Sequence, residues 1–130
     1  MLIQLAQNVW KINEDSNCSI IKLQNKNKVK INDNNLDNPI IVIDSCPKIY
    51  RQKFEQQFKQ IADPRDVKIG LFTHFHHDHI GNFDLFPNAQ FYAAKQEINF
   101  FKKEDFGAVL DKKIASDFFA LLKEKRLQPL

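Results

Sequence analysis

Glycine is scarce in this sequence: the 130 residues contain only Gly70, Gly81 and Gly107. A Rossmann or P-loop phosphate cradle needs several glycines at fixed short spacings, and these three positions cannot provide them. Nucleotide binding through such loops is therefore excluded.

An excess of charge of one sign is also lacking. The 19 basic and 16 acidic residues leave a net charge of +3, spread along the chain. The nearest basic cluster, Lys123, Lys125 and Arg126, includes Glu124 and is typical of the last turn of a helix. A surface that follows nucleic-acid phosphates needs clustered Lys and Arg, so we expect no nucleic-acid partner.

Long apolar runs are absent as well. The longest strong one, Ile40 to Ile43, is far shorter than the roughly 18 residues that span a bilayer. The first residues, Met1 to Gln4, lack the charged-then-apolar pattern of a signal peptide. We therefore expect a cytoplasmic protein with no membrane partner. The two cysteines, Cys18 and Cys46, are too few for a disulfide framework and are expected to be small buried side chains.

The residues that are present favour one domain, 1–130. Hydrophobic residues make up 43% of the chain and include 12 phenylalanines, enough for a real core. In the first third, short apolar stretches alternate with polar breaks, which is typical of strands, and an asparagine-rich segment follows. Strands are predicted at residues 2–5, 9–12 and 19–23, with a surface loop at 25–38 that carries a weak strand at 29–31.

The remaining two thirds alternate strands with helices. Residues 40–43 form an uninterrupted β-branched run, which indicates a strand buried on both faces. Apolar residues at 50, 54, 58 and 61 predict a helix from about Lys48. The pattern then predicts strands at 67–72 and 90–93, and helices from about Lys95 and from about Ala108 to Arg126. This order indicates an α/β fold, whose active site lies beyond the carboxyl ends of the strands.

All four histidines lie in one hexapeptide, His74-Phe75-His76-His77-Asp78-His79. Imidazole and carboxylate donors suit zinc, iron or manganese. In an extended segment, residues two apart point to one side, so His74 and His76 can chelate one ion. If the chain then turns into a helix, Asp78 and His79 can address a second ion about 4 Å away.

The segment Thr73 to Gly81 resembles the Thr-His-x-His-x-Asp-His-x-Gly signature of the metallo-β-lactamase superfamily. The run Ile41 to Asp44 resembles that family's buried strand ending in aspartate, and Phe86 to Ala89 resembles the segment after the motif in lactonase-like and glyoxalase-II-like members. The likeness covers residues 1–100. It implies an α/β fold with a mixed sheet and flanking helices: the N-terminal half of the family's αββα sandwich.

The resemblance also implies a site. His74 and His76 would hold a first zinc ion, and Asp78 and His79 a second, with iron or manganese as alternatives. Asp78 is also the candidate catalytic residue, and His77 stands at a variable position that binds no metal. Asp44 resembles the aspartate that orients the ligand loop by hydrogen bonds. The implied reaction is hydrolysis of a small-molecule substrate by metal-activated water.

Two departures from the family pattern stand out. Cys46 occupies a position where the family usually has glycine after Asp-x. The family fold also needs a second half that supplies further ligands, and this chain has no histidine after His79. Each ion would keep two family-type ligands, fewer than the four that zinc prefers. Asp84, Glu97, Asp105 and Cys46 are possible replacements among which spacing does not choose.

Three interpretations stay open at this point. The chain is the N-terminal half of a hydrolase, from a truncated or split gene or as a fragment. Alternatively, a second chain or a second copy completes the site, or the chain is a non-catalytic module that binds metal or a protein. The half-domain interpretations also predict that one face of the sheet at 40–43 and 67–72 lacks its cover.

Overall fold

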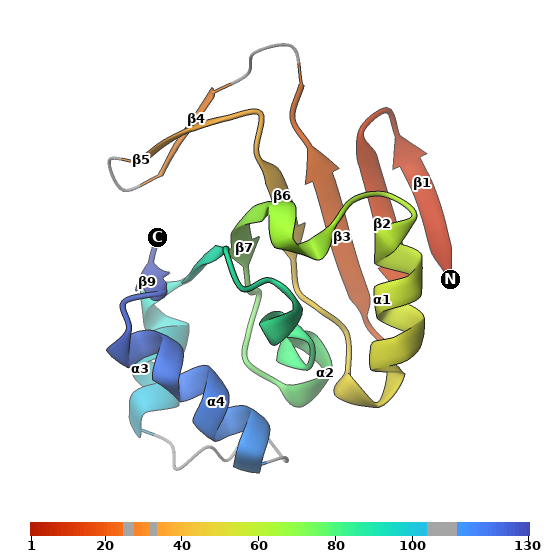
Figure 1. Ribbon diagram of the computed structural model, residues 1–130. Helices are drawn as coiled ribbons and strands as arrows, with labels where there is room; N and C mark the ends of the chain where they lie inside the picture. Colours follow the sequence, from red (N-terminus) through yellow and green to blue (C-terminus); the bar gives the residue numbers. More distant parts are fainter. Residues whose placement is uncertain (25–27, 32–33, 104–111) are drawn as a thin grey trace.

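The computed structural model describes residues 1–24, 28–31, 34–103 and 112–130. It contains a seven-stranded mixed sheet and a separate two-stranded hairpin (Figure 1). The strand order in the large sheet is β1-β2-β3-β6-β7-β8-β9, and β4 pairs with β5 in the hairpin. The strands are β1 (Leu2–Ala6), β2 (Val9–Asn13), β3 (Asn17–Lys22), β4 (Lys28–Ile31), β5 (Asn34–Asp37), β6 (Ile40–Ile43), β7 (Val67–Leu71), β8 (Gln90–Ala93) and β9 (Leu127–Pro129).

The described helices lie mainly in the second half of the chain, with α1, α2 and α4 in front of the sheet in Figure 1. Among the residues described, no helix is long and apolar enough to cross a membrane. The α-helices are α1 (Arg51–Lys59), α2 (His77–Ile80), α3 (Lys95–Lys103) and α4 (Lys112–Lys123), and the short 3-10 helices are η1 (Lys48–Tyr50), η2 (Pro64–Asp66) and η3 (Phe83–Leu85).

The first three strands form an antiparallel meander. Its two turns contain Asn8 at φ 64° and Asp15 at φ 63°. Asparagine and aspartate tolerate this left-handed conformation better than most residues, so the local sequence favours both turns. The three strands predicted for this region are confirmed within one or two residues.

The other half of the large sheet is parallel. Strand β7 pairs with β6 and with β8, and β8 pairs with β9. Because parallel strands end at the same edge, the residues after β6 and β7 emerge side by side, which places Asp44 next to the histidine motif. Strand β9 is a short edge strand that the sequence pattern does not predict.

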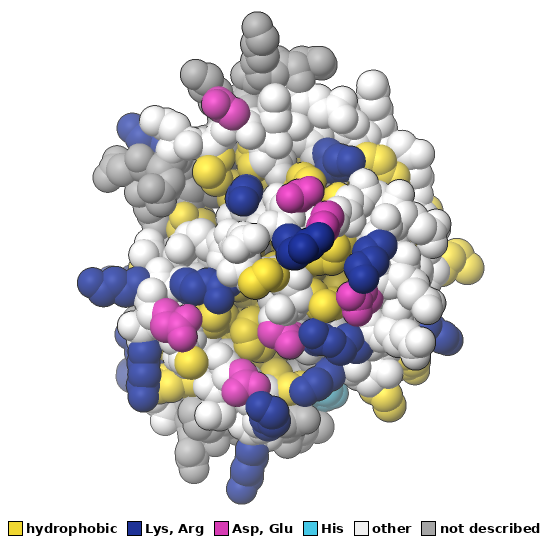
Figure 2. Space-filling model, viewed as in Figure 1, with side chains coloured by type: hydrophobic (Ala, Val, Ile, Leu, Met, Phe, Trp, Pro, Cys, Tyr) yellow, Lys and Arg dark blue, Asp and Glu magenta, His cyan; other side chains and the backbone are white. Residues whose placement is uncertain are grey.

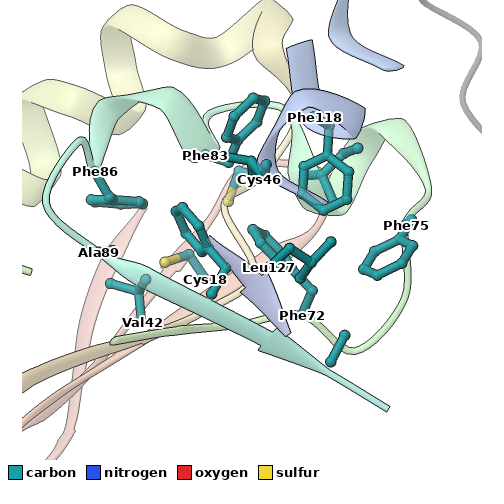
Figure 3. Close-up of a cluster of buried hydrophobic side chains, with 14 of the residues drawn as sticks. Cys18, Val42, Cys46, Phe72, Phe75, Phe83, Phe86, Ala89, Phe118 and Leu127 are labelled. Atoms are coloured by element: carbon teal, nitrogen blue, oxygen red, sulfur yellow. The ribbon is translucent and has the colours of Figure 1, made fainter. Parts of the chain in front are cut away.

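One face of the sheet, which we call the helix face, packs against the helices. Register aligns Ile20, Val42, Gly70, Phe91 and Leu127 across five strands on this face. The four side chains among them are at most 3% exposed and belong to the main core. A Cβ on Gly70 would lie 2.3 Å from the Phe91 ring, so this position needs glycine. Aromatic rings from the helices and loops fill the space above the sheet (Figure 3).

The opposite face, which we call the open face, is less covered. Register aligns Ser19, Ile43 and Leu71 there, and Val9, Ile21 and Ile41 beside them. These side chains are only half-buried, and none belongs to the main core cluster of the described residues. The expectation that Ile40–Ile43 is buried on both faces is therefore wrong: Val42 is 2% exposed, but Ile41 and Ile43 are only half-buried. Cover on the open face is local, because Ile69 and Tyr92, which register places on the same face, are at most 2% exposed.

Several predicted boundaries shift. Residues 48–50 form a 3-10 turn, so α1 begins at Arg51 rather than at Lys48, and Phe54 and Phe58 are its buried residues. The described part of α4 ends at Lys123, and Ala108 lies outside the described residues. The weak strand predicted at 29–31 is part of β4, paired with an unpredicted β5.

The surface over the helices mixes charges of both signs with small apolar areas. Figure 2 shows basic and acidic side chains interspersed on this side of the molecule. Such interspersed charge is typical of a hydrated surface. Cys18 and Cys46 are both buried and free, as the sequence predicts.

Candidate metal centre

The histidine motif begins three residues after the end of β7, at the sheet edge where β6 also ends. Ile43 pairs with Leu71, and the Asp44 amide donates to the Leu71 carbonyl at 2.9 Å. This pairing brings the side chain of Asp44 to the start of the motif. The edge is the one at which an α/β sheet is expected to carry its site.

Three imidazole rings of the motif converge. The ring centroids of His74 and His76 lie 4.7 Å apart, and those of His74 and His79 lie 4.0 Å apart. Helix α2 starts after His76 and turns the chain, so that Asp78 Oδ2 lies 3.5 Å from His79 Nε2. The turn into a helix that a second ion site would require is therefore present, and it brings His74, His76, Asp78 and His79 into one cluster.

Asp44 anchors the motif at two points. Its Oδ1 accepts a hydrogen bond from the Thr73 amide at 2.9 Å, and its Oδ2 accepts from the Thr73 hydroxyl at 2.7 Å. Oδ2 also lies 2.9 Å from His79 Nδ1. As a carboxylate, Asp44 can only accept, so a neutral His79 carries its proton on Nδ1 and keeps Nε2 free for another partner.

The same carboxylate acts on His74 through Thr73. The Thr73 hydroxyl gives its single proton to Asp44, and Thr73 Oγ1 also lies 3.0 Å from His74 Nδ1. Because that proton is already used, His74 Nδ1 must donate to Thr73. His74 therefore keeps its Nε2 lone pair free as well, and one buried aspartate sets the tautomer of two histidines.

The protonation of His74 also favours metal binding. Burial, followed by repulsion from His79 and His76, lowers its pKa from the ordinary histidine value, while Asp44 and Glu97 act in the opposite direction. A lowered pKa keeps the imidazole neutral at physiological pH. Neutral imidazole is the form that binds a metal ion.

The turn after β6 adopts an uncommon backbone conformation. Asp44 has φ 63° and Cys46 has φ 57°. For residues other than glycine this left-handed conformation costs about 1–2 kcal/mol. Glycine at position 46 would avoid the cost, which explains the family preference, but the turn forms with cysteine.

The other possible ligands lie elsewhere. Cys46 is buried with its Sγ directed at the carbonyls of Ile12 and Ser16, and burial raises the pKa of its thiol to about 11. Asp84 forms an ion pair with Arg51 at 2.7 Å. Glu97 acts on His74 by its charge, and Asp105 lies outside the described residues.

His77 takes a different direction from the other histidines. It lines an open hollow of about 490 Å³ whose wall also includes Asp15, Lys48 and Ile49. Of the motif residues, only Asp78 borders this hollow together with His77.

The donor set suits a metal ion of the zinc type, but the coordination it provides is partial. The nitrogen and oxygen donors, the free Nε2 atoms and the lowered pKa of His74 all fit such an ion. Within the described residues, however, no group of three or more His, Cys, Asp and Glu side chains is arranged to hold one. The cluster therefore fits part of a coordination shell, and the remaining ligands must come from water or from another segment.

Sequence reasoning did not find three polar residues beneath the motif. Ser16, Ser45 and Asn82 are at most 8% exposed and bind the backbone around α2. The one feature of the sequence that could have pointed to them is adjacency to the motif residues: Ser45 follows Asp44, and Asn82 follows Gly81. Their contacts join segments more than thirty residues apart, which no local pattern reveals.

Comparison with known proteins agrees with the fold. No protein-family model matches the chain. A probable metallo-hydrolase of Methanocaldococcus jannaschii is 44% identical over 52 residues, which are 39% of this chain and 26% of that protein. A subclass B3 metallo-β-lactamase of Bradyrhizobium japonicum superposes with a TM-score of 0.60 at 20% identity, covering 77% of this chain and 35% of that one.

Two further solved structures extend the likeness. A putative metallo-β-lactamase of Thermotoga maritima gives a TM-score of 0.56 at 23% identity, over 87% of this chain and 48% of that one. The flavodiiron protein of Giardia intestinalis gives 0.59 at 11% identity, over 100% of this chain and 30% of that one. The chain thus spans about a quarter of the curated relative and less than half of each solved structure.

Proposed function

We propose that this chain, which has the fold of the N-terminal half of the metallo-β-lactamase superfamily, forms the metal-binding part of a metal-dependent hydrolase. His74 and His76 would hold one ion, and Asp78 and His79 a second. Zinc suits these imidazole and carboxylate donors, with iron or manganese as alternatives. When bound, such an ion lowers the pKa of its water toward neutrality and polarises the bond to be cleaved.

The hydrogen bonds of Asp44 carry this proposal. Through Thr73 Oγ1 and directly, Asp44 fixes the Nδ1 protons of His74 and His79, so both rings present a free Nε2 to the cluster. A carboxylate behind a ligand histidine is the usual support of a metal site, because it sets the tautomer and the ring direction. Histidines that serve only as solvated loop residues need no such arrangement.

Asp78 has a role in the chemistry as well as in binding. Its half-buried carboxylate lies beside His79 Nε2 and can accept a hydrogen bond from a water in the cluster. It would thereby orient that water toward the substrate. A small molecule with an ester, lactone, thioester or similar bond is the proposed substrate, which rests on the likeness to hydrolases.

The chain on its own is proposed to be a poor catalyst. With two protein ligands for each ion, an attacking hydroxide would be neither firmly held nor well aimed. The half-buried Ile21, Ile41 and Ile43 on the open face support a second chain, or a second copy of this one, that covers the sheet and completes the site. The alternative is a non-catalytic half-domain that binds metal or a protein through the same elements.

The test is metal content. The double variant His74→Ala/His76→Ala should lose the zinc of the first site, measured by elemental analysis after equilibrium dialysis. His77→Ala is the matched control, and it should keep nearly the wild-type content because the His77 ring is not among the converging rings of His74, His76 and His79. Equal loss in both variants would refute the assignment of ligands.

Activity separates the two functional interpretations. Hydrolysis of a generic ester or lactone should be weak for the purified chain and should rise when the missing ligands are supplied by a second polypeptide. Rapid, metal-dependent turnover by the monomer would contradict the proposal that the site is incomplete. Metal binding without turnover in any assembly would favour the non-catalytic half-domain.

A further inference from the structure

Helix α2 carries two of the candidate ligands but is only four residues long. A single helical turn is not stable by its own hydrogen bonds. The last carbonyls of such a helix also have no partner within it. Asp78 and His79 therefore need support from elsewhere if their side chains are to keep one direction.

Ser45 supplies this support under His79. The Ser45 amide donates to the His79 carbonyl at 2.6 Å, and its hydroxyl donates to the same oxygen at 3.0 Å. The hydroxyl oxygen in turn accepts from the Asn82 amide at 3.1 Å. Ser45 is fully buried, so no water competes for these bonds.

Asn82 fastens the other end of α2 to the same loop. Its Nδ2 group donates to the carbonyls of Ser45 at 2.8 Å, Pro47 at 3.1 Å and Cys46 at 3.3 Å. A rotated amide would turn its oxygen toward three carbonyl oxygens, so the hydrogen bonds fix its orientation. Gly81 makes the approach possible, because a Cβ there would lie 2.4 Å from the Lys48 amide and 2.6 Å from the Cys46 carbonyl oxygen.

Ser16, in the turn between β2 and β3, supports Asp78. Its hydroxyl donates to the Asp78 carbonyl at 2.5 Å, and the Ser16 side chain is nearly buried. The carbonyls of both neighbouring ligand residues are thus held by serine hydroxyls that come from two different loops. The resulting arrangement of Ser16, Ser45 and Asn82 is here called the polar clamp.

We infer that the polar clamp positions the second pair of ligands, Asp78 and His79, and that its three members are positioning residues for metal binding. The inference rests on the proposed function, because it assigns these residues to the same site. The clamp holds the backbone while Asp44 holds the His79 ring from the other side. Together they define both the place of His79 and the direction of its Nε2.

The inference has a readout in the metal-free protein. In the wild type, the His79 Nδ1 proton should give one sharp signal in a long-range proton–nitrogen NMR spectrum, since it is bonded to Asp44. In Ser45→Ala and Asn82→Leu, His79 should exchange between tautomers. An unchanged His79 signal in both folded variants would overturn the clamp as a positioning device.

Cobalt titration followed by visible absorption provides the second readout. Loss of supporting hydrogen bonds behind metal ligands weakens binding by about tenfold or more, so each variant should bind Co²⁺ about tenfold more weakly. Ser116→Ala and Asn88→Leu are matched controls at exposed positions and should bind like the wild type. Wild-type affinity in the clamp variants would overturn the inference, whereas no binding by the wild type would instead refute the proposed function.

A purely structural role predicts a different result. In that case, Ser45→Ala and Asn82→Leu would lower the unfolding temperature, but the folded fraction would keep the wild-type His79 signal. If these two variants do not fold, Ser16→Ala decides, because it removes one hydrogen bond at the edge of the clamp. Ser16→Thr keeps the hydroxyl and should restore binding, and failure to do so would count against the inference.

Discussion

The two faces of the large sheet differ in how they are covered. On the helix face, Ile20, Val42 and Phe91 are at most 2% exposed under a layer of helices and aromatic rings. On the open face, Ile21, Ile41 and Ile43 are equally apolar but only half-buried. The helices α1 to α4 thus cover the helix face and form one hydrophobic core with it.

This difference shows that apolar residues of β6 and β7 point to both faces of the sheet, of which the helices cover one. Parallel strands are found almost only where both faces are covered, and their sequences are correspondingly apolar throughout. The described residues provide one of those layers. The second apolar face is a surface suited to another layer of the same kind.

The largest expected loss of stability is at Phe118, which α4 packs against the helix face. The centroid of its ring lies 4.9–5.6 Å from the ring centroids of Phe72, Phe75, Phe83 and Phe101, and the side chain is fully buried. Phe118→Ala should lower the free energy of unfolding by about 3–5 kcal/mol, since it leaves a large cavity. Urea denaturation followed by circular dichroism measures this. A loss below about 1 kcal/mol would mean that the helices do not form a fixed layer.

The next largest effect is the difference in unfolding free energy between substitutions at two neighbouring positions of one strand. Val42 and Ile43 are neighbours in β6, on the helix face and the open face respectively. Val42→Thr buries a hydroxyl and should cost about 1–3 kcal/mol. Ile43→Thr keeps a β-branched side chain on a half-covered surface and should cost less than about 1 kcal/mol.

The same two variants should also differ in how strongly they self-associate. Sedimentation velocity across a dilution series should show less association for Ile43→Thr than for the wild type, because the open face becomes more polar. Val42→Thr should associate like the wild type wherever it is folded. Equal costs in stability and equal association for both variants would remove the distinction between the faces.

The smallest expected effect on stability comes from the polar contacts of Glu14, at the rim of the helix face. Glu14 Oε1 accepts from Gln57 of α1 at 2.9 Å and from the Met1 ammonium at 3.0 Å. These two contacts, the ammonium first, lower the Glu14 pKa below its ordinary value of 4.5. A lowered pKa in the folded state gives stability above pH 4.5 that is lost as the pH falls through the folded-state value.

Glu14→Gln should therefore cost about 0.5 kcal/mol near neutral pH and nothing at strongly acidic pH. Thermal unfolding of both proteins across this range provides the measurement. A cost that stays constant down to acidic pH would show that the ionised carboxylate is not the cause.

The elements predicted best are those with strong local patterns. The apolar run Ile40–Ile43 predicts strand β6, and the motif at 74–79 predicts a cluster of histidines at the edge of the sheet. Both signals lie within a few neighbouring residues, where a sequence pattern is easiest to interpret. The fold that the resemblance to the metallo-β-lactamase superfamily implies is confirmed. Strand β9, with Gln128 and Pro129, has no strand pattern of its own, and it pairs in parallel with the edge of β8.

The polar support of the site was harder to predict. Ser45 and Asn82 are ordinary residues in the sequence, and their roles depend on a contact between the turn after β6 and the end of α2. The sequence predicted that one face of the sheet would lack cover. Only the strand register shows that Val42 points to the helix face and Ile43 to the open face.

The strand order also has a consequence for the order of folding. The β1-β2-β3 meander closes over short turns, whereas β6 reaches β7 only after the chain has passed through α1. Short loops close at a smaller entropic cost than long ones, so contacts between distant segments form later. We expect amides of the meander to gain protection first in pulse-labelled hydrogen exchange and those of β7 later. Because Asp44 and the histidines meet only when β6 and β7 pair, the candidate metal centre would then be among the last parts of the chain to assemble.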